Sequence, residues 1–413
     1  GKSTTLRMIA GLEEITSGAI AIDDRVVNNV LPKDRDIAMV FQNYALYPHM
    51  TVYDNMAFGL KLRKFSKAEI DQRVREASAM LGLDPSLRRK HQALSGGHRQ
   101  RVPMLTMMLA EAVNETNEGP LSDFSMSEKD RYELKIAGLL HDCGKITTPV
   151  HVVDKATKLE TIFDRIHMID TRFEVQLRDA EIRALRAQCA VSGDADADRA
   201  ALAGAMHAEQ ARLRADREFL RSANVGSEGM SLDDQARVRR IAAYRFTGPD
   251  GVERDFLDED EVRNLTVRFG TLNDDERKII NNHIVVTIRM LESLPWPKHL
   301  KNVPEYAGGH HERMDGKGYP RGLTGAQMSP QARMMAIADV FEALTADDRP
   351  YKPGKSLSEA LLILSRMAGE QHLDAELFEL FLRSGACMAY ARRFLRPEKI
   401  DVDDVSAYLP GPA

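Results

Sequence analysis

Cysteine is scarce in this chain, and long apolar runs are absent. The three cysteines, Cys143, Cys189 and Cys387, are odd in number and far apart, so they form neither a disulfide framework nor a CxxC zinc motif. No apolar run reaches the roughly 18 residues of a membrane span, and no signal peptide is recognisable. We therefore expect a cytoplasmic protein without a transmembrane segment.

A basic surplus is also missing. Lysine and arginine number 57 against 62 aspartates and glutamates, which gives a net charge of −5. This balance argues against DNA or RNA as a partner. The 413 residues predict two or three domains. The chain begins with Gly1 inside a motif rather than with methionine, so we expect a fragment.

Two regions of the chain differ in character. Residues 1–97 combine β-like runs at 19–22 and 37–41 with a helical stretch at 67–81, which predicts an α/β segment. From residue 98 onward the patterns predict helices, apart from a small hairpin within 243–257. Long charged helices fill residues 160–222, and they are typical of solvated faces or a helical hairpin. From these long helices alone, we also expect that the protein forms a homodimer.

The start of the chain carries part of a nucleotide-binding motif. The run Gly1-Lys2-Ser3-Thr4 has the form of the end of a P-loop, in which backbone amides and the lysine hold phosphates. Gln42 lies in VFQNYALYPHMTV at 40–52, and LSGG follows at 94–97. These segments resemble the Q-loop and the signature motif of sugar-importer ABC ATPases. The resemblance covers residues 1–97 and implies an incomplete α/β P-loop NTPase fragment.

This fragment lacks the parts that hydrolyse ATP. The front of the P-loop is missing, and VPMLTMMLAE at 102–111 stands where an apolar strand ending in Asp-Glu should follow the signature. Without that carboxylate pair, magnesium and the attacking water have no partner. We therefore expect exposed strand edges, no Mg-ATP turnover and no ABC permease partner.

A second group of residues has the composition of a metal site. His141-Asp142 ends an apolar helical segment and offers one nitrogen and one carboxylate, a mixed set that suits iron or manganese. The pair His310-His311 stands between glycines, which makes poor core packing. Asp339 is a carboxylate in an otherwise apolar helix and needs a partner there. The sequence therefore predicts a metal centre assembled from distant parts of the chain.

These residues lie in motifs that resemble the HD-GYP phosphodiesterases. HDCGK at 141–145, HHERMDGKGYP at 310–320, IADVFEALT at 337–345 and RPYK at 349–352 come in that family's order. The resemblance covers residues 98–410 and implies a mainly α protein with an all-helical HD-superfamily phosphohydrolase domain. It also implies iron or manganese ions that activate a hydroxide, which attacks cyclic di-GMP and gives pGpG or GMP.

The resemblance assigns roles one position at a time. Lys145 matches a lysine beside the hydroxide and the substrate phosphate, where a cation stabilises developing charge. Glu342 replaces an aspartate expected three residues after Asp339, and with Lys145 and Asp142 it makes up the catalytic set. Substrate contacts are expected from Tyr319, Arg349 and Lys352. Metal ligands are expected at His98, His141, Asp142, His283, His310, His311 and Asp339.

One histidine ligand has two candidates. His283 follows a stretch, 270–276, that resembles the Gly-x-Leu-x-x-x-Glu pattern preceding the family's histidine. His167 stands at a suitable sequence distance from Asp142. We prefer His283, in which case His167 faces solvent or packs, and residues 160–268 are a helical insertion within the domain.

His98 belongs to two motifs at once. It continues the ABC signature, or it begins the first HD-GYP helix as a metal ligand, and residues 103–112 fit the second reading alone. Three-metal members of the family carry a glutamate where this chain has Leu94, so we expect two divalent metal ions. We hypothesise that the chain is a fusion joined at this shared stretch, either natural or produced by sequence assembly.

Three functions are then in competition. The first is an active cyclic-di-GMP phosphodiesterase of bacterial second-messenger signalling. The second is a catalytically weak module that binds cyclic dinucleotides. The third, an ABC transporter ATP-binding subunit, is opposed by the missing Asp-Glu strand.

Overall fold

The structure is a computed structural model of the chain. It describes residues 8–10, 13–22, 25–31, 35, 50–63, 65–81, 83–84, 87–88, 98–117, 119, 121–191, 196–226, 229–248, 250–347 and 354–409.

The described residues are mainly helical, which confirms the predicted fold class. Two antiparallel hairpins pair β1 (Ala21–Ile22) with β2 (Arg25–Val26), and β3 (Arg245–Thr247) with β4 (Glu253–Asp255). The longer helices are α2 (Val52–Leu62), α3 (Lys67–Leu81), α4 (His98–Glu115), α5 (Glu128–Leu140), α7 (Ile166–Ala190), α8 (Asp196–Asn224), α9 (Leu232–Ala242), α11 (Asp274–Glu292), α13 (Pro330–Thr345), α14 (Leu357–Gly369), α15 (Ala375–Arg383) and α16 (Ala386–Phe394). Shorter helices are α6 (Val150–Val153), α10 (Glu259–Leu265) and α12 (Val303–Gly308), and 3-10 turns are η3 (Cys143–Thr147), η4 (Lys298–Leu300), η5 (Gly325–Gln327), η6 (Pro397–Lys399) and η7 (Ser406–Tyr408).

Several sequence predictions can be compared with these elements. The helix predicted over 67–81 is α3, and the hairpin predicted within 243–257 is β3–β4. The charged stretch at 160–222 contains α7 and α8. The β-like run at 19–22 contributes β1, whereas the run at 37–41 lies outside the described residues.

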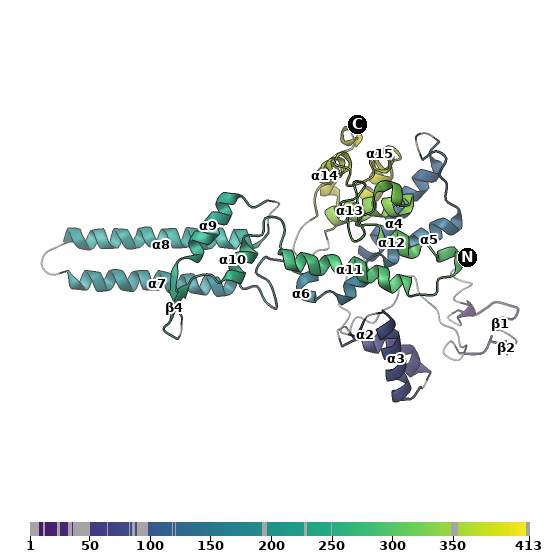
Figure 1. Ribbon diagram of the computed structural model, residues 1–413, viewed down its shortest axis with the longest axis horizontal. Helices are drawn as coiled ribbons and strands as arrows, with labels where there is room; N and C mark the ends of the chain where they lie inside the picture. Colours follow the sequence, from purple (N-terminus) through teal and green to yellow (C-terminus); the bar gives the residue numbers. More distant parts are fainter. Residues whose placement is uncertain are drawn as a thin grey trace.

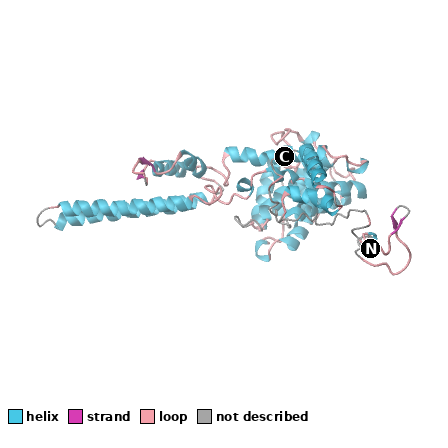
Figure 2. Ribbon diagram, turned by 90° about the horizontal axis from the view of Figure 1, so that it is seen from below, coloured by secondary structure: helices cyan, strands magenta, loops and turns pink. Residues whose placement is uncertain are grey.

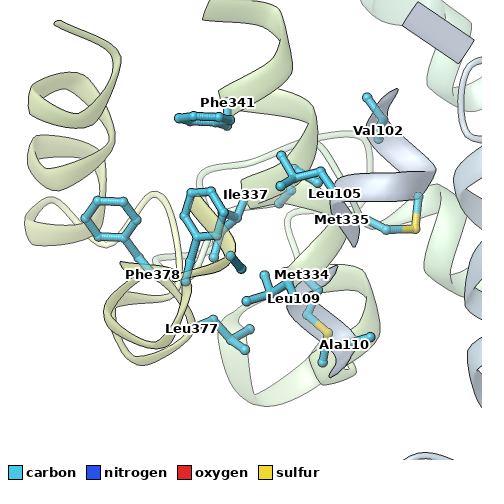
Figure 3. Close-up of a cluster of buried hydrophobic side chains, with 14 of the residues drawn as sticks. Val102, Leu105, Leu109, Ala110, Met334, Met335, Ile337, Phe341, Leu377 and Phe378 are labelled. Atoms are coloured by element: carbon cyan, nitrogen blue, oxygen red, sulfur yellow. The ribbon is translucent and has the colours of Figure 1, made fainter. Parts of the chain in front are cut away.

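The helical body centres on α13. Ser329 caps its start by accepting a hydrogen bond from Ala332 N, and Pro330 occupies the first turn, where its missing N–H costs nothing. Most of its side chains are buried on every face, so the helix runs through the core. Apolar side chains of α4 and α15 meet those of α13, as Figure 3 shows for Leu105, Ile337 and Phe378.

Side chains of α7, α8, α9 and α10 form a separate apolar core. Its fully buried members run from Leu159 to Leu265 and include Phe173 and Phe256. The α7–α8 pair extends away from the helical body, and α9, α10 and the β3–β4 hairpin cover one side of it (Figures 1 and 2). These residues therefore have a hydrophobic core of their own, as an inserted unit requires. The insertion and its boundaries at 160 and 268 stay a prediction.

Lys155 joins this unit to the body. Its buried Nζ donates to both carboxylate oxygens of Glu276 at 2.8 Å and to Asn264 Oδ1 at 3.1 Å. Glu276 belongs to the first turn of α11, and Asn264 belongs to α10. The ammonium therefore ties α10, at the end of the unit with its own core, to the start of α11.

A third, smaller cluster joins α2 and α3. Val52, Ala57, Ile70 and Val74 are buried in it, and Ile146 of η3 packs against it. No helix of the described part is both long and apolar enough to cross a bilayer.

Replacement of Lys155 should destabilise the junction. Lys155→Ala leaves Glu276 and Asn264 without their buried cation, and we expect a loss of about 3–5 kcal/mol in the free energy of unfolding. Urea denaturation followed by circular dichroism measures it. The matched control is Lys278→Ala on α11, the helix of Glu276. The Lys278 side chain is 79% exposed beside Asp275, and its loss should stay below about 1 kcal/mol. Equal effects of the two variants would contradict the role of Lys155.

Candidate metal centre

Five elements bring the predicted metal ligands together. His141 caps the end of α5, and Asp142 precedes η3. His283 lies in the middle of α11, His310 and His311 follow α12, and Asp339 lies in α13. The side chains of His141, His283 and His310 are buried.

Gly144 permits the close approach of η3 to α11. A Cβ atom at this position would lie 2.0 Å from the carbonyl oxygen of His283 and 2.6 Å from Thr287 N. Its backbone N–H donates to Thr287 Oγ1 at 2.9 Å. A side chain at position 144 would therefore push the Asp142 segment away from His283.

Three histidines are oriented in the same way. The Nδ1 atoms of His141, His283 and His310 lie 2.5–2.6 Å from the carbonyl oxygens of Gly138, Ile280 and Ala307, each three residues earlier. A carbonyl can only accept, so Nδ1 carries the hydrogen and the lone pair stays on Nε2. Within the described part of the chain, none of these three buried Nε2 atoms has a hydrogen-bond partner.

Two carboxylates face these nitrogens. His283 Nε2 lies 3.2 Å from Asp142 Oδ1, and His141 Nε2 lies 3.5 Å from Asp142 Oδ2. His141 Nε2 is also 3.5 Å from Asp339 Oδ1. Asp142 thus contacts histidines from two elements, which is the position expected of a bridging carboxylate.

The donor set fits divalent metal ions. Ligand atoms of His283, His310 and His311 lie within 4.8 Å of one another, and so do those of His141, Asp142 and His310. Buried lone pairs without a partner are costly, and nitrogen mixed with carboxylate oxygen suits iron, manganese or zinc. These residues could therefore hold metal in two overlapping groups that share His310.

Burial and charge set the protonation of the cluster. Burial lowers the pKa of His311 to about 4 and, with the neighbouring His311, holds the pKa of His310 well below its usual value. Burial also disfavours charge on His141, but Asp142 and Asp339 outweigh it and raise the pKa of this histidine. Burial opposes ionisation of Asp339 too, yet its contact with His141 leaves the pKa of this carboxyl below its usual value.

Two further predicted residues border the cluster. Lys145 Nζ donates to Asp142 Oδ2 at 2.5 Å. The ring of Tyr319 stacks on His311, with ring centroids 4.9 Å apart and an angle of 18° between the planes. Burial, together with Asp339 and Asp142, raises the pKa of Tyr319 to about 12. The phenol is therefore a neutral hydrogen-bond donor at physiological pH.

Sequence reasoning gave no role to Glu312, which organises the loop carrying Tyr319. Its buried carboxylate accepts from the backbone N–H of Arg321 at 2.8 Å and of Leu323 at 2.9 Å. Gly318 passes so close that a Cβ there would lie 2.4 Å from Glu312 Cα. The sequence feature that could have indicated this role is the presence of a charged residue inside a glycine-rich run.

Other predicted residues have different surroundings. Glu342 is fully buried, and its Oε1 accepts from Arg101 Nε of α4 at 2.8 Å; its catalytic role stays a prediction. His167 is exposed at the start of α7 and belongs to neither group of ligand atoms. The side chain of His98 and the residues Gly1, Lys2, Ser3, Thr4, Gln42, Arg349 and Lys352 lie outside what the structure describes.

Comparison with protein families finds two kinds of domain in the chain. Two HD-domain models match residues 96–196 and 260–377, and an ABC transporter model matches residues 1–113. HD domains point to a metal-dependent phosphohydrolase. The ABC and HD matches overlap at 96–113, the stretch that contains the shared motif.

Characterised relatives match as ABC ATPases. The chain is 53% identical over 166 residues to a multiple sugar-binding transport ATP-binding protein, MsmK, of Streptococcus mutans, covering 40% of this chain and 44% of the relative. It is 52% identical over 166 residues to an oligosaccharides import ATP-binding protein, MsmX, of Bacillus subtilis, covering 40% and 45%. The match to an sn-glycerol-3-phosphate import ATP-binding protein, UgpC, of Cupriavidus pinatubonensis is 48% over 188 residues, covering 44% and 50%. The chain thus spans about half the length of these relatives.

Removal of a ligand should lower the metal content. His283→Ala removes a nitrogen that lies 3.2 Å from Asp142, and we expect at least a tenfold loss of iron or manganese affinity. Elemental analysis after equilibrium dialysis measures it. His167→Ala serves as the control and should bind as much metal as the unmodified protein. If instead His167→Ala loses metal and His283→Ala does not, the ligand assignment is wrong.

Proposed function

We propose that residues 98–410 form an HD-GYP-type phosphodiesterase that hydrolyses cyclic di-GMP. The observation that carries this proposal is the convergence of three buried Nε2 atoms with the carboxylates of Asp142 and Asp339. The motif order around these residues gives the substrate class.

In the proposed enzyme, His141, Asp142, His283, His310, His311 and Asp339 hold two iron or manganese ions, with His98 as a further ligand. The bound ions supply Lewis acidity, which neutralises phosphate charge and lowers the pKa of water. Asp142 fixes the position of Lys145, whose Nζ lies 2.5 Å away. The ammonium then faces the phosphate and stabilises the negative charge that develops there.

The reaction is an attack of water on one phosphodiester. An oxygen–phosphorus bond forms and the bond from phosphorus to the ribose 3′ oxygen breaks, which opens the ring to linear pGpG. Tyr319, held against His311, borders the place where the substrate sits, and Arg349 and Lys352 bind the phosphates. A second hydrolysis gives GMP.

The N-terminal segment has a different proposed role. Its likeness to sugar-importer ATPases concerns relatives that the chain covers only by half. Since the Asp-Glu strand is missing from the sequence, we propose that it neither turns over Mg-ATP nor serves a permease. The alternative function is that of a cytoplasmic module that binds cyclic dinucleotides and hydrolyses them only weakly.

The direct test is turnover by the full chain. Protein loaded anaerobically with Fe(II) or Mn(II) should convert cyclic di-GMP to pGpG or GMP, as chromatography of the products would show. Asp142→Ala removes the carboxylate shared by His141 and His283, and we expect a loss of activity of at least a thousandfold. Lys145→Ala should lower kcat by about a hundredfold through lost charge stabilisation while leaving metal content unchanged.

Two results separate the alternatives. Tight binding of cyclic di-GMP without product under both metals would favour the binding module. Metal-loaded protein that neither binds nor cleaves cyclic di-GMP, but hydrolyses another phosphoester, would refute the substrate and leave the metal centre standing.

A further inference from the structure

Helix α7 carries an apolar stripe that its own domain does not cover. Met168, Val175, Ile182 and Cys189 follow one another at intervals of seven residues, and Leu185 stands three residues after Ile182. The exposed fractions are 46% for Met168, 44% for Ile182 and 51% for Leu185, and Cys189 is exposed as well. Apolar residues at heptad spacing are the pattern of a helix–helix seam.

The stripe lies opposite the buried face of the same helix. At 3.6 residues per turn, the two sets are centred about 180° apart around the axis. Figure 2 shows the α9–α10 layer on one side of the α7–α8 pair and no described helix on the other. Thus α7 has one face for its own core and a second, apolar face that no described helix covers. The buried set is Ile166, Ile169, Phe173, Leu177 and Ala180.

Charged side chains beside the stripe point to the same conclusion. Asp170, Glu174 and Arg183 form ion pairs with Arg221, Arg217 and Glu209 of α8. By contrast, Arg178, Asp179, Glu181 and Arg186 form no ion pair with any residue that the structure describes. Arg178 lies within the stripe and the other three lie beside it. Together they carry two charges of each sign, so the surface is complementary to itself.

We propose that the stripe packs antiparallel against α7 of a second copy of this chain, about a two-fold axis near residue 180. This arrangement sets Arg178 against Ile182 of the second copy, beside the second copy's Glu181, and brings Asp179 close to Arg186 of the second copy. A parallel arrangement would instead stack Arg178 on itself in the seam. Like charges set against each other across an interface are unfavourable.

The seam is a contact of one helix with one helix. With the axis near residue 180, residues 170–190 of α7 overlap over about 30 Å, and a helix with its side chains is about 10–12 Å wide. The resulting face of roughly 300–350 Å² per molecule is smaller than the ~800 Å² per partner of standard interfaces, so the charge pairs beside the stripe are needed to fix the arrangement. The helical bodies then lie at opposite ends of the dimer, with both candidate metal centres clear of the seam.

The first test is the mass of the full chain in solution. We expect a dimer by light scattering, and the double variant Ile182→Glu/Leu185→Glu should raise the dimer dissociation constant at least a hundredfold. Leu232→Glu on α9, where the leucine is 80% exposed away from the stripe, is the matched control and should remain dimeric. A monomeric unmodified protein at about 50 μM, where even an interface of only micromolar Kd is mostly dimeric, or a dimeric double variant, would overturn the proposal.

The second test fixes the direction of packing. In the antiparallel seam, position 171 faces Cys189 of the second copy. Thr171→Cys should therefore form covalent dimers on mild oxidation, since positions 171 and 189 of one helix are about 27 Å apart and cannot pair within a molecule. The unmodified protein should not cross-link, because the two Cys189 residues of an antiparallel seam lie about 27 Å apart, while Cys387 is buried and Cys143 is partly buried. Arg183→Cys on another face should not cross-link either.

Cross-linking of the unmodified protein through Cys189 would show parallel packing and overturn the arrangement, as would a dimer in which Thr171→Cys fails to cross-link. Neither test depends on phosphodiesterase activity, so the outcome is independent of the proposed function.

Discussion

The rest of the structure depends on the cost of burying three imidazole nitrogens for which the described part of the chain offers no hydrogen-bond partner. Each Nδ1 is committed to a backbone carbonyl three residues earlier, so each Nε2 must find a partner in the centre or lose about 1–3 kcal/mol. Asp142 and Asp339 lie near them without hydrogen-bonding these nitrogens. Bound metal ions would relieve this cost, and the packing of α5, α11, α12 and α13 holds the side chains in the arrangement that such ions would need.

Two residues outside the ligand set support this packing, Gly144 and Glu312. Gly144 lets η3 lie on α11, which places Asp142 against His283 although the two are distant in sequence. Glu312 holds the loop of Tyr319 by two backbone N–H groups, so the tyrosine ring stays stacked on His311. The site is thus supported by residues that are neither ligands nor catalytic groups.

Some of this could be predicted from the sequence and some could not. The helical class and the limits of α3 followed from apolar periodicity, and His141, His310 and Asp339 stood out because polar groups in apolar or glycine-rich surroundings need a partner. The ion pair of Glu342 with Arg101 could not be predicted, since it joins residues 241 positions apart by packing alone. The outward stripe of α7 was equally hidden, because in sequence it looks like part of one amphipathic helix until its other face is seen to be buried.

The central claim is that these side chains hold metal. Anomalous scattering from crystals of the manganese-loaded full chain tests it most directly. The account predicts anomalous peaks within coordination distance of Nε2 of His141, His283 and His310. Peaks elsewhere, with these three nitrogens left uncoordinated, would contradict it.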